Sequence, residues 1–131
     1  MVVENAVVVM VVEDDDGIRA PLIDLLESLQ FVPLAVNSGE AALRTLRGGC
    51  QPSVILLDLK MSGLNGWDFR REQMNDSSLS KIPVVIMTAL SIPGESARAE
   101  VGDVTWLSKP FSPEQLGEAL SAALGRDPRR T

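Results

Sequence analysis

The sequence contains no histidine among its 131 residues and only one cysteine, Cys50. Without histidine, the chain cannot perform Ser-His-Asp or Cys-His catalysis, bind zinc through imidazole or carry phosphohistidine. A single cysteine cannot form an intrachain disulfide or a thiolate metal site, which fits a reducing compartment. Carboxylates, hydroxyl groups and lysines are therefore the side chains left to carry chemistry.

Long hydrophobic runs and a basic amino-terminal segment are also missing. The longest unbroken apolar run covers residues 6–12, which is far too short to span a bilayer. Residues 1–5 lack the positive charge that begins a secretory signal peptide. We therefore expect a cytoplasmic protein without a membrane partner.

Positive charge is scarce, because twelve Lys and Arg stand against eighteen Asp and Glu and give a net charge of −6. Arg126, Arg129 and Arg130 lie in the last six residues with one aspartate, so residues 1–125 hold nine basic against seventeen acidic residues, or −8. This surface repels phosphate backbones and anionic lipid, so we expect no direct nucleic-acid binding. We interpret the three arginines as a frayed end or the start of a linker.

The length and the composition, with 45% hydrophobic and 23% charged residues, predict one globular domain. Short apolar runs alternate with segments in which apolar residues recur every three or four positions. This alternation is typical of an α/β fold, in which helices cover both faces of a parallel sheet. We predict a domain at residues 1–125 followed by a tail or linker start at residues 126–131. The predicted strands are residues 7–12, 31–36, 54–57, 84–87 and 104–107.

The five predicted helices differ in how clearly their ends are marked. Asp16 is the candidate N-cap of the first helix and Ser38 that of the second, and the third covers about residues 66–74. Ser112 predicts a capping box for the last helix, which Gly125 ends. Residues 91–101 contain few apolar side chains, so the fourth helix is expected to be short and weakly held.

Polar side chains follow four of the predicted strands. Glu13 and Asp14 follow the first strand, and Asp58, Thr88 and Lys109 follow the third, fourth and fifth. Ligands of doubly wound sheets bind at the carboxyl ends of the strands, so we expect these five residues to meet there. Three crowded carboxylates favour a proton or a bound cation, and oxygen ligands select a hard ion such as Mg²⁺.

A phosphoryl group suits the other two side chains. Lysine binds phosphate as a point charge, and threonine can donate a hydrogen bond to a phosphoryl oxygen. The candidate nucleophile is a carboxylate, which would form an acyl phosphate. Neither a Gly-x-x-x-x-Gly-Lys loop nor a Gly-x-Gly-x-x-Gly motif follows any predicted strand, so nucleotide binding has little support.

Four motifs resemble those of receiver domains in two-component response regulators, including the chemotaxis regulators. They are residues 11–15 (VVEDD), 57–66 (LDLKMSGLNG), 87–89 (MTA) and 108–111 (SKPF), in the order and with the spacing of that family. The resemblance covers about residues 7–125, and the motifs are specific jointly rather than singly. It implies a flavodoxin-like fold with a doubly wound, five-stranded parallel sheet in the order 2-1-3-4-5.

The resemblance also implies roles for the residues at the strand ends. Asp58 would accept a phosphoryl group from a histidine kinase or a phosphotransfer protein. Glu13, Asp14 and Asp58, with the backbone carbonyl of Lys60, would hold Mg²⁺ directly or through water.

Thr88 and Lys109 would contact the phosphoryl oxygens, and the Lys109-Pro110 bond is expected to be cis. Trp106 occupies the position of the family's switch aromatic, usually Tyr or Phe, which moves inward when the threonine moves toward the phosphate. A large aromatic on a short strand can also serve only for packing, so both interpretations of Trp106 stay open.

Two positions qualify the resemblance. Ser62 stands where the family commonly has proline, which should leave the loop after Asp58 less rigid. Leu90, two residues beyond Thr88, offers no group to orient a hydrolytic water, so we hypothesise a long-lived phosphoryl state.

Simpler interpretations and other functions compete with this one. Acidic residues after a strand can merely favour the next helix, although Asp15 and Asp16 suit that role better than Glu13 and Asp14. A receiver-like interaction module that works without phosphorylation is the main alternative. A small Mg²⁺-dependent phosphatase or phosphotransferase is a third possibility.

A receiver would catalyse only its own phosphorylation and dephosphorylation and would control a downstream protein target or a fused output domain. Residues 126–131 leave no space for such a domain, so we expect a stand-alone receiver or a fragment of a larger regulator or hybrid kinase. The weak fourth helix argues for a monomer or a weak dimer.

Overall fold

Five parallel strands form a single sheet in the computed structural model, which describes residues 6–89 and 93–129. The strands lie in the order β2-β1-β3-β4-β5, so the predicted fold class is confirmed. The chain runs from β1 out to β2 and then back to β3, which makes the carboxyl ends of β1 and β3 the expected place for a ligand. The bounds are β1 (Val8–Val12), β2 (Val32–Val36), β3 (Val54–Asp58), β4 (Val84–Thr88) and β5 (Thr105–Ser108).

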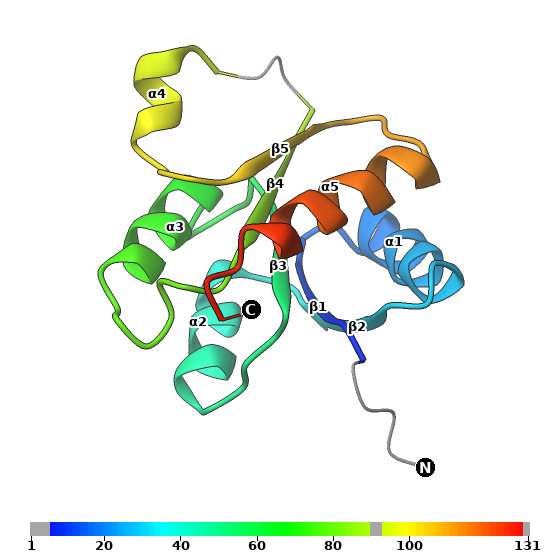
Figure 1. The fold of residues 1–131 in the computed structure, drawn as a ribbon, viewed down its shortest axis with the longest axis horizontal. Helices are drawn as coiled ribbons and strands as arrows, with labels where there is room; N and C mark the ends of the chain where they lie inside the picture. The colour runs from blue at the N-terminus through cyan, green and yellow to red at the C-terminus, as the bar shows by residue number, and fades with distance from the viewer. Residues whose placement is uncertain (1–5, 90–92, 130–131) are drawn as a thin grey trace.

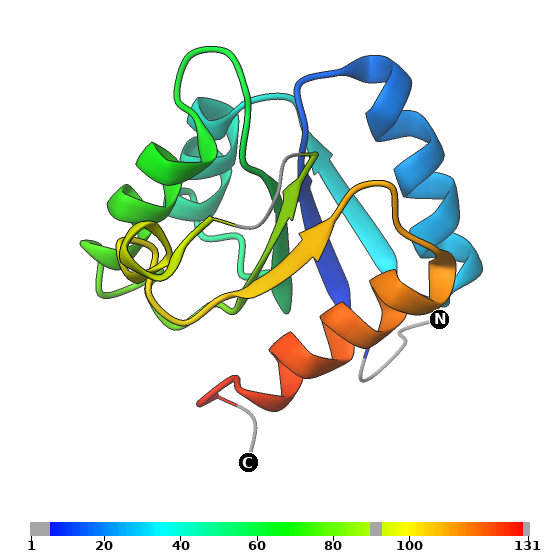
Figure 2. The ribbon, with the colours of Figure 1, turned by 90° about the horizontal axis from the view of Figure 1, so that it is seen from above.

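Helices cover both faces of this sheet (Figures 1 and 2). One face carries α1 (Asp16–Ser28) and α5 (Pro113–Gly125). The other carries α2 (Gly39–Arg47), α3 (Gly66–Met74) and α4 (Glu95–Ala99). Within the described ranges, no helix has both the length and the apolar character needed to cross a bilayer.

Alternate residues of the central strands enter two hydrophobic cores, because successive side chains of a strand point to opposite faces. Val9 and Val11 pack on the side of α1 and α5, whereas Met10 and Val12 pack on the side of α2 and α3. All residues of β3 and β4 are buried. Burial of each apolar side chain of these strands contributes roughly 1.5–3 kcal/mol, so the polar residues at the strand ends stand on a rigid scaffold.

Side-chain caps fix the starts of the helices. Ser38 caps α2, and Ser112 forms the predicted capping box with Gln115 at the start of α5. The prediction for α1 was wrong by one residue, because Asp15 is the N-cap and Asp16 is the first helical residue. The Asp15 carboxylate accepts a hydrogen bond from a free N–H of the first turn, which Asp16 cannot do from inside the helix.

The fourth helix is weakly packed, as predicted, but it is shorter than the predicted range of 91–101. It covers only Glu95–Ala99, and residues 91–92 lie outside the described part of the chain. None of its five residues is buried, and its N-cap, Gly94, has no side chain to hold the first turn. Packing of α4 itself therefore contributes little to the fold.

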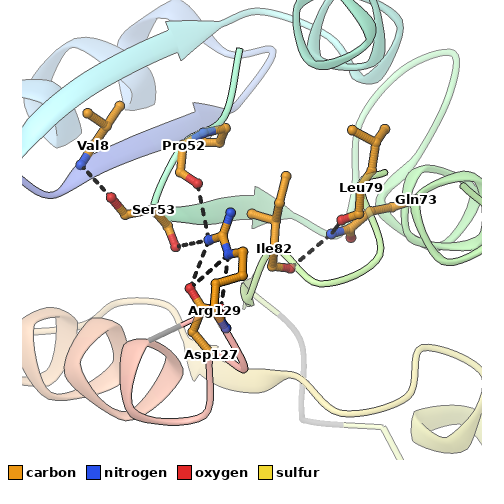
Figure 3. A network of polar contacts seen from close by, with 8 residues as sticks. All are labelled: Val8, Pro52, Ser53, Gln73, Leu79, Ile82, Asp127 and Arg129. Carbon is orange, nitrogen blue, oxygen red and sulfur yellow. Dashed lines mark hydrogen bonds and ion pairs between the residues drawn. The ribbon is translucent and has the colours of Figure 1, made fainter. Parts of the chain in front are cut away.

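A buried arginine holds the segment that follows α4. Arg70 of α3 is 6% exposed and donates from Nε to the carbonyl of Val101 at 2.7 Å and from Nη1 to Oε1 of Gln73 at 2.8 Å. Burial lowers the pKa of Arg70. Gln73 in turn donates to the carbonyls of Leu79 and Ile82, at 3.0 and 2.9 Å (Figure 3). This polar network links α3 to the segments before β4 and β5.

The interpretation of the arginine-rich tail as a frayed end is wrong for residues 126–129. Helix α5 includes Gly125, and its C-cap is Arg126, whose guanidinium donates to Oγ1 of Thr105 and lies 3.8 Å from Asp103. Arg130 lies outside the described residues. The division of the chain at residue 125 stays a prediction.

Arg129 fastens the tail to the amino-terminal end of the sheet (Figure 3). Its guanidinium donates to both carboxylate oxygens of Asp127, which is 4% exposed, and to the carbonyls of Pro52 and Ser53. The hydroxyl of Ser53 accepts from the N–H of Val8 at 3.1 Å. Arg129 and Ser53 together thus connect the end of α5 with the starts of β1 and β3.

Candidate functional site

The five polar residues predicted to share one edge of the sheet lie together in the structure. Glu13 and Asp14 directly follow β1, Asp58 ends β3, Thr88 ends β4, and Lys109 directly follows β5. All five line one cavity of about 280 Å³. Parallel strands bring their carboxyl ends to the same edge, which is why residues so far apart in the sequence meet here.

Three carboxylates and one ammonium form the centre of this cavity. One oxygen from each of Glu13, Asp14 and Asp58 lies within 4.8 Å of the others. Glu13 is 0% and Asp58 6% exposed. The Nζ atom of Lys109 lies 3.2 Å from Oε1 of Glu13 and 3.4 Å from Oδ2 of Asp58. When all four groups are ionised, the cluster keeps two negative charges, which suits a divalent cation.

The environment of Glu13 favours its protonated form. Burial, followed by the hydrogen bond and the negative charge of Asp58, raises the pKa of Glu13 to about 7. The ammonium of Lys109 and the N–H of Asp15 oppose this shift. A cation entering the cavity would therefore compete with a proton for Glu13 near neutral pH.

Asp14 has the opposite environment. The N–H and the Oγ of Ser62 both donate to Oδ2 of Asp14, at 2.9 and 2.8 Å, and these hydrogen bonds lower the pKa of Asp14. Ser62 was expected to make its loop less rigid, but it ties that loop to Asp14. Asp14 and Ser62 are 48 positions apart in the chain, so no local pattern could predict this contact.

The chain after β3 turns closely around Asp58. The N–H of Lys60 donates to Oδ1 of Asp58 at 3.3 Å, and Lys60 lines the cavity. At Gly66, a Cβ atom would lie 2.7 Å from the Cα of Leu59 and 2.8 Å from the carbonyl oxygen of Asp58. A side chain at position 66 would push α3 away from β3, so glycine is required to shape the loop that carries Lys60.

Pairing of β4 with β5 places Lys109 beside Thr88. The N–H of Lys109 donates to the carbonyl of Thr88 at 2.8 Å, and Thr88 lies opposite Ser108 in the sheet. Thr88 is 2% exposed, and the Lys109-Pro110 bond is cis, as predicted. The Thr88 side chain and the Lys109 ammonium thus belong to the same cavity as Asp58.

Trp106 is half-buried on β5 and packs against the aromatic ring of Trp67 in α3. The ring centroids are 6.2 Å apart and the planes are inclined by 53°. Both rings border the core on the side of α2 and α3. The packing interpretation accounts for this contact, and the switch role of Trp106 stays a prediction. Leu90 lies outside the described residues, so the hypothesis about phosphoryl lifetime stays a prediction as well.

An apolar cavity of about 540 Å³, which no sequence motif predicted, lies beside the site. Ile18 and Pro21 of α1 line it on one side, and Lys109, Pro110 and Phe111 line it on the other. Ile18 is 42% exposed, so its side chain adds apolar surface to the wall of this cavity. The cavity shares Lys109 and Ile18 with the acidic cavity, so an apolar partner seated here would lie next to Asp58.

Comparison with known proteins agrees with this arrangement. A family model of the response regulator receiver domain matches residues 9–121. The two-component response regulator ORR11 of Oryza sativa subsp. indica is 33% identical over 117 residues, which cover 88% of this chain and 80% of that protein.

One longer protein and one solved structure are also similar to this chain. The phosphate regulon transcriptional regulatory protein PhoB of Escherichia coli strain K12 is 32% identical over 119 residues, or 90% of this chain and 52% of PhoB. The chain therefore spans about half the length of PhoB. The crystal structure of the signal receiver domain of a signal transduction histidine kinase from Syntrophus aciditrophicus has a TM-score of 0.83 and 28% identity, covering 96% of this chain and 95% of that one.

Proposed function

Because the chain belongs to the response regulator receiver family, we propose that it is a phosphorylation-controlled switch with Asp58 as its phosphoacceptor. The observation that carries this proposal is the ammonium of Lys109, which lies within 3.4 Å of the carboxylates of both Glu13 and Asp58. Such a cluster is suited to the two charged species of phosphotransfer, a divalent cation and a phosphoryl group.

The transfer needs few protein groups. An oxygen of Asp58 attacks the phosphorus of a phosphohistidine on the donor, the P–N bond breaks as the O–P bond forms, and the released imidazole takes a proton from solvent. Lys109 and the hydroxyl of Thr88 stabilise the oxygens of the transferred group. Water later hydrolyses the acyl phosphate and regenerates the carboxylate of Asp58. Both steps occur on the chain's own side chain, so the only reactions that the chain catalyses are its own phosphorylation and dephosphorylation.

A hard divalent cation such as Mg²⁺ fits the available donors. Glu13, Asp14 and Asp58 have carboxylate oxygens within 4.8 Å of one another, and the backbone carbonyl of Lys60 would add a fourth oxygen ligand. When bound, the ion neutralises negative charge that otherwise repels the incoming phosphoryl group.

The phosphodonor is a histidine kinase or a phosphotransfer protein, which we propose docks on the apolar cavity beside α1. A helix that buries apolar side chains against Ile18, Pro21 and Phe111 would bring its phosphohistidine next to Asp58. We place this encounter in the cytoplasm.

Phosphorylation would then alter the surface around β5. In this proposal Thr88 moves toward the phosphoryl group and Trp106 changes its packing against Trp67. A downstream protein target or a fused output domain would read this change, and the receiver itself would be a monomer or a weak dimer.

Incubation with Mg²⁺ and acetyl phosphate tests the proposal. We expect an acid-stable, base-labile phosphoryl label on wild-type protein and on Asp24→Asn, which changes an exposed carboxylate, but none on Asp58→Asn. Peptide mass spectrometry would locate the label. A folded wild-type protein without label would favour a phosphorylation-independent interaction module. Multiple turnover on a free phosphoester would favour a phosphatase instead.

A further inference from the structure

Asp14 is the only half-buried member of the three clustered carboxylates, yet a distant segment holds its side chain. Two donors of Ser62, the N–H and the Oγ, bind the same oxygen of Asp14, Oδ2, at 2.9 and 2.8 Å. Two hydrogen bonds to one oxygen fix the orientation of the carboxylate. They leave Oδ1 of Asp14 unengaged by Ser62.

The contact also joins the two loops that supply the acidic cavity. Asp14 lies between β1 and α1, whereas Ser62 lies between β3 and α3 on the same loop as Lys60. The residue after Ser62 is Gly63, whose φ of 71° turns the chain sharply and is readily adopted only by glycine. The backbone thus fixes the position from which Ser62 donates.

We propose that Ser62 is a positioning residue that pre-organises Asp14 for a divalent cation, an inference that rests on the proposed function. A carboxylate that is not fully buried loses rotamer freedom when it binds a cation, and Ser62 restricts the side chain of Asp14 beforehand. Hydrogen-bond partners of metal ligands typically change metal affinity by about 10–100-fold. A proline at position 62 would supply neither donor, because it has no N–H and no hydroxyl.

Calorimetric titration of the metal-free chain with Mg²⁺ at pH 8 measures this effect. We expect Ser62→Ala, which removes the hydroxyl donor, to raise the Kd for Mg²⁺ about tenfold. Ser62→Thr keeps a hydroxyl and should restore most of the affinity. Ser78→Ala is the matched control, because Ser78 makes the same pair of hydrogen bonds to Oδ1 of Asp76, at 3.0 and 2.6 Å, outside the cavity.

A second measurement separates positioning from a general structural role. We expect Ser62→Ala and Ser78→Ala to lower the free energy of unfolding by similar amounts in the presence of a chelator. Addition of Mg²⁺ should then stabilise Ser78→Ala as much as wild type, but Ser62→Ala less, because metal stabilisation follows affinity. Equal Kd values for Ser62→Ala and wild type would overturn the positioning role alone. A wild-type chain that binds no Mg²⁺ would overturn the proposed metal site and this inference with it.

Discussion

Lys109 places one ammonium between two buried carboxylates, and this position gives the first prediction. We expect Lys109→Ala to slow labelling of Asp58 by acetyl phosphate roughly 100-fold, because it removes a group that stabilises charge on the transferred oxygens. Phosphoprotein gels sampled over time would measure the rate. Lys81→Ala, which removes an exposed lysine, is the control, and equal rates in the two variants would contradict the role of Lys109.

The raised pKa of Glu13 makes folding stability depend on pH. Glu13 titrates near its ordinary value of 4.5 in the unfolded chain but near 7 in the folded one, so between these values only the folded state holds the proton. The stabilisation is therefore complete below pH 4.5 and is lost as the pH rises through 7, by up to roughly 3 kcal/mol.

Urea denaturation at pH 5 and pH 7.5 in the presence of a chelator would show this loss. No histidine titrates in the same window, because the chain has none. Glu13→Gln should remove the decrease, whereas Glu118→Gln, which changes an exposed carboxylate, should retain it. A stability that increases over this pH range in wild type would show that Glu13 is not protonated in the fold.

At the scale of elements, local patterns predicted all five strands of the sheet and the helices that bury side chains in the two cores. The predicted range of α3 is the observed one, Gly66–Met74, and the capping box of Ser112 is present. The predicted length of α4 was wrong, because the helix begins only after Gly94, which has no side chain to cap it, and ends at Ala99. The chain beyond the helix is held instead by the hydrogen bond from Arg70 to the carbonyl of Val101. No local spacing reveals a contact of that kind.

The next prediction therefore concerns Arg70 and the chain around α4. We expect Arg70→Ala to lower the free energy of unfolding by about 2–3 kcal/mol, because it removes the donors that satisfy buried acceptors at Val101 and Gln73. Hydrogen exchange should become faster in residues 95–104. Arg71→Ala is the neighbouring control, since Arg71 makes an exposed ion pair with Asp68 worth less than about 1 kcal/mol. Equal exchange in the two variants would mean that other contacts hold α4.

At the scale of the whole molecule, the acidic cavity and the polar cluster of Asp127 and Arg129 occupy opposite ends of the sheet. The acidic cavity at the carboxyl ends could be predicted, because the topology brings residues such as Asp58 and Lys109 together. The cluster of Asp127 and Arg129 at the amino ends could not, because it depends on where α5 ends relative to the start of β3 (Figure 3). The positive charge of the last residues suggested a frayed tail in solvent, whereas Arg129 forms an ion pair with the buried carboxylate of Asp127.

This pair gives the last prediction. We expect Arg129→Ala to destabilise the fold by about 3 kcal/mol, because it removes a cation from Asp127, whose side chain is only 2% exposed. Arg126→Ala should cost much less, since its ion-pair partner, Asp103, is 80% exposed. The double variant Asp127→Ala/Arg129→Ala should recover part of the loss, because the buried carboxylate is then absent. Urea denaturation of the four proteins would measure these differences. If Arg129→Ala is as stable as Arg126→Ala, the end of α5 is held to the sheet by other contacts.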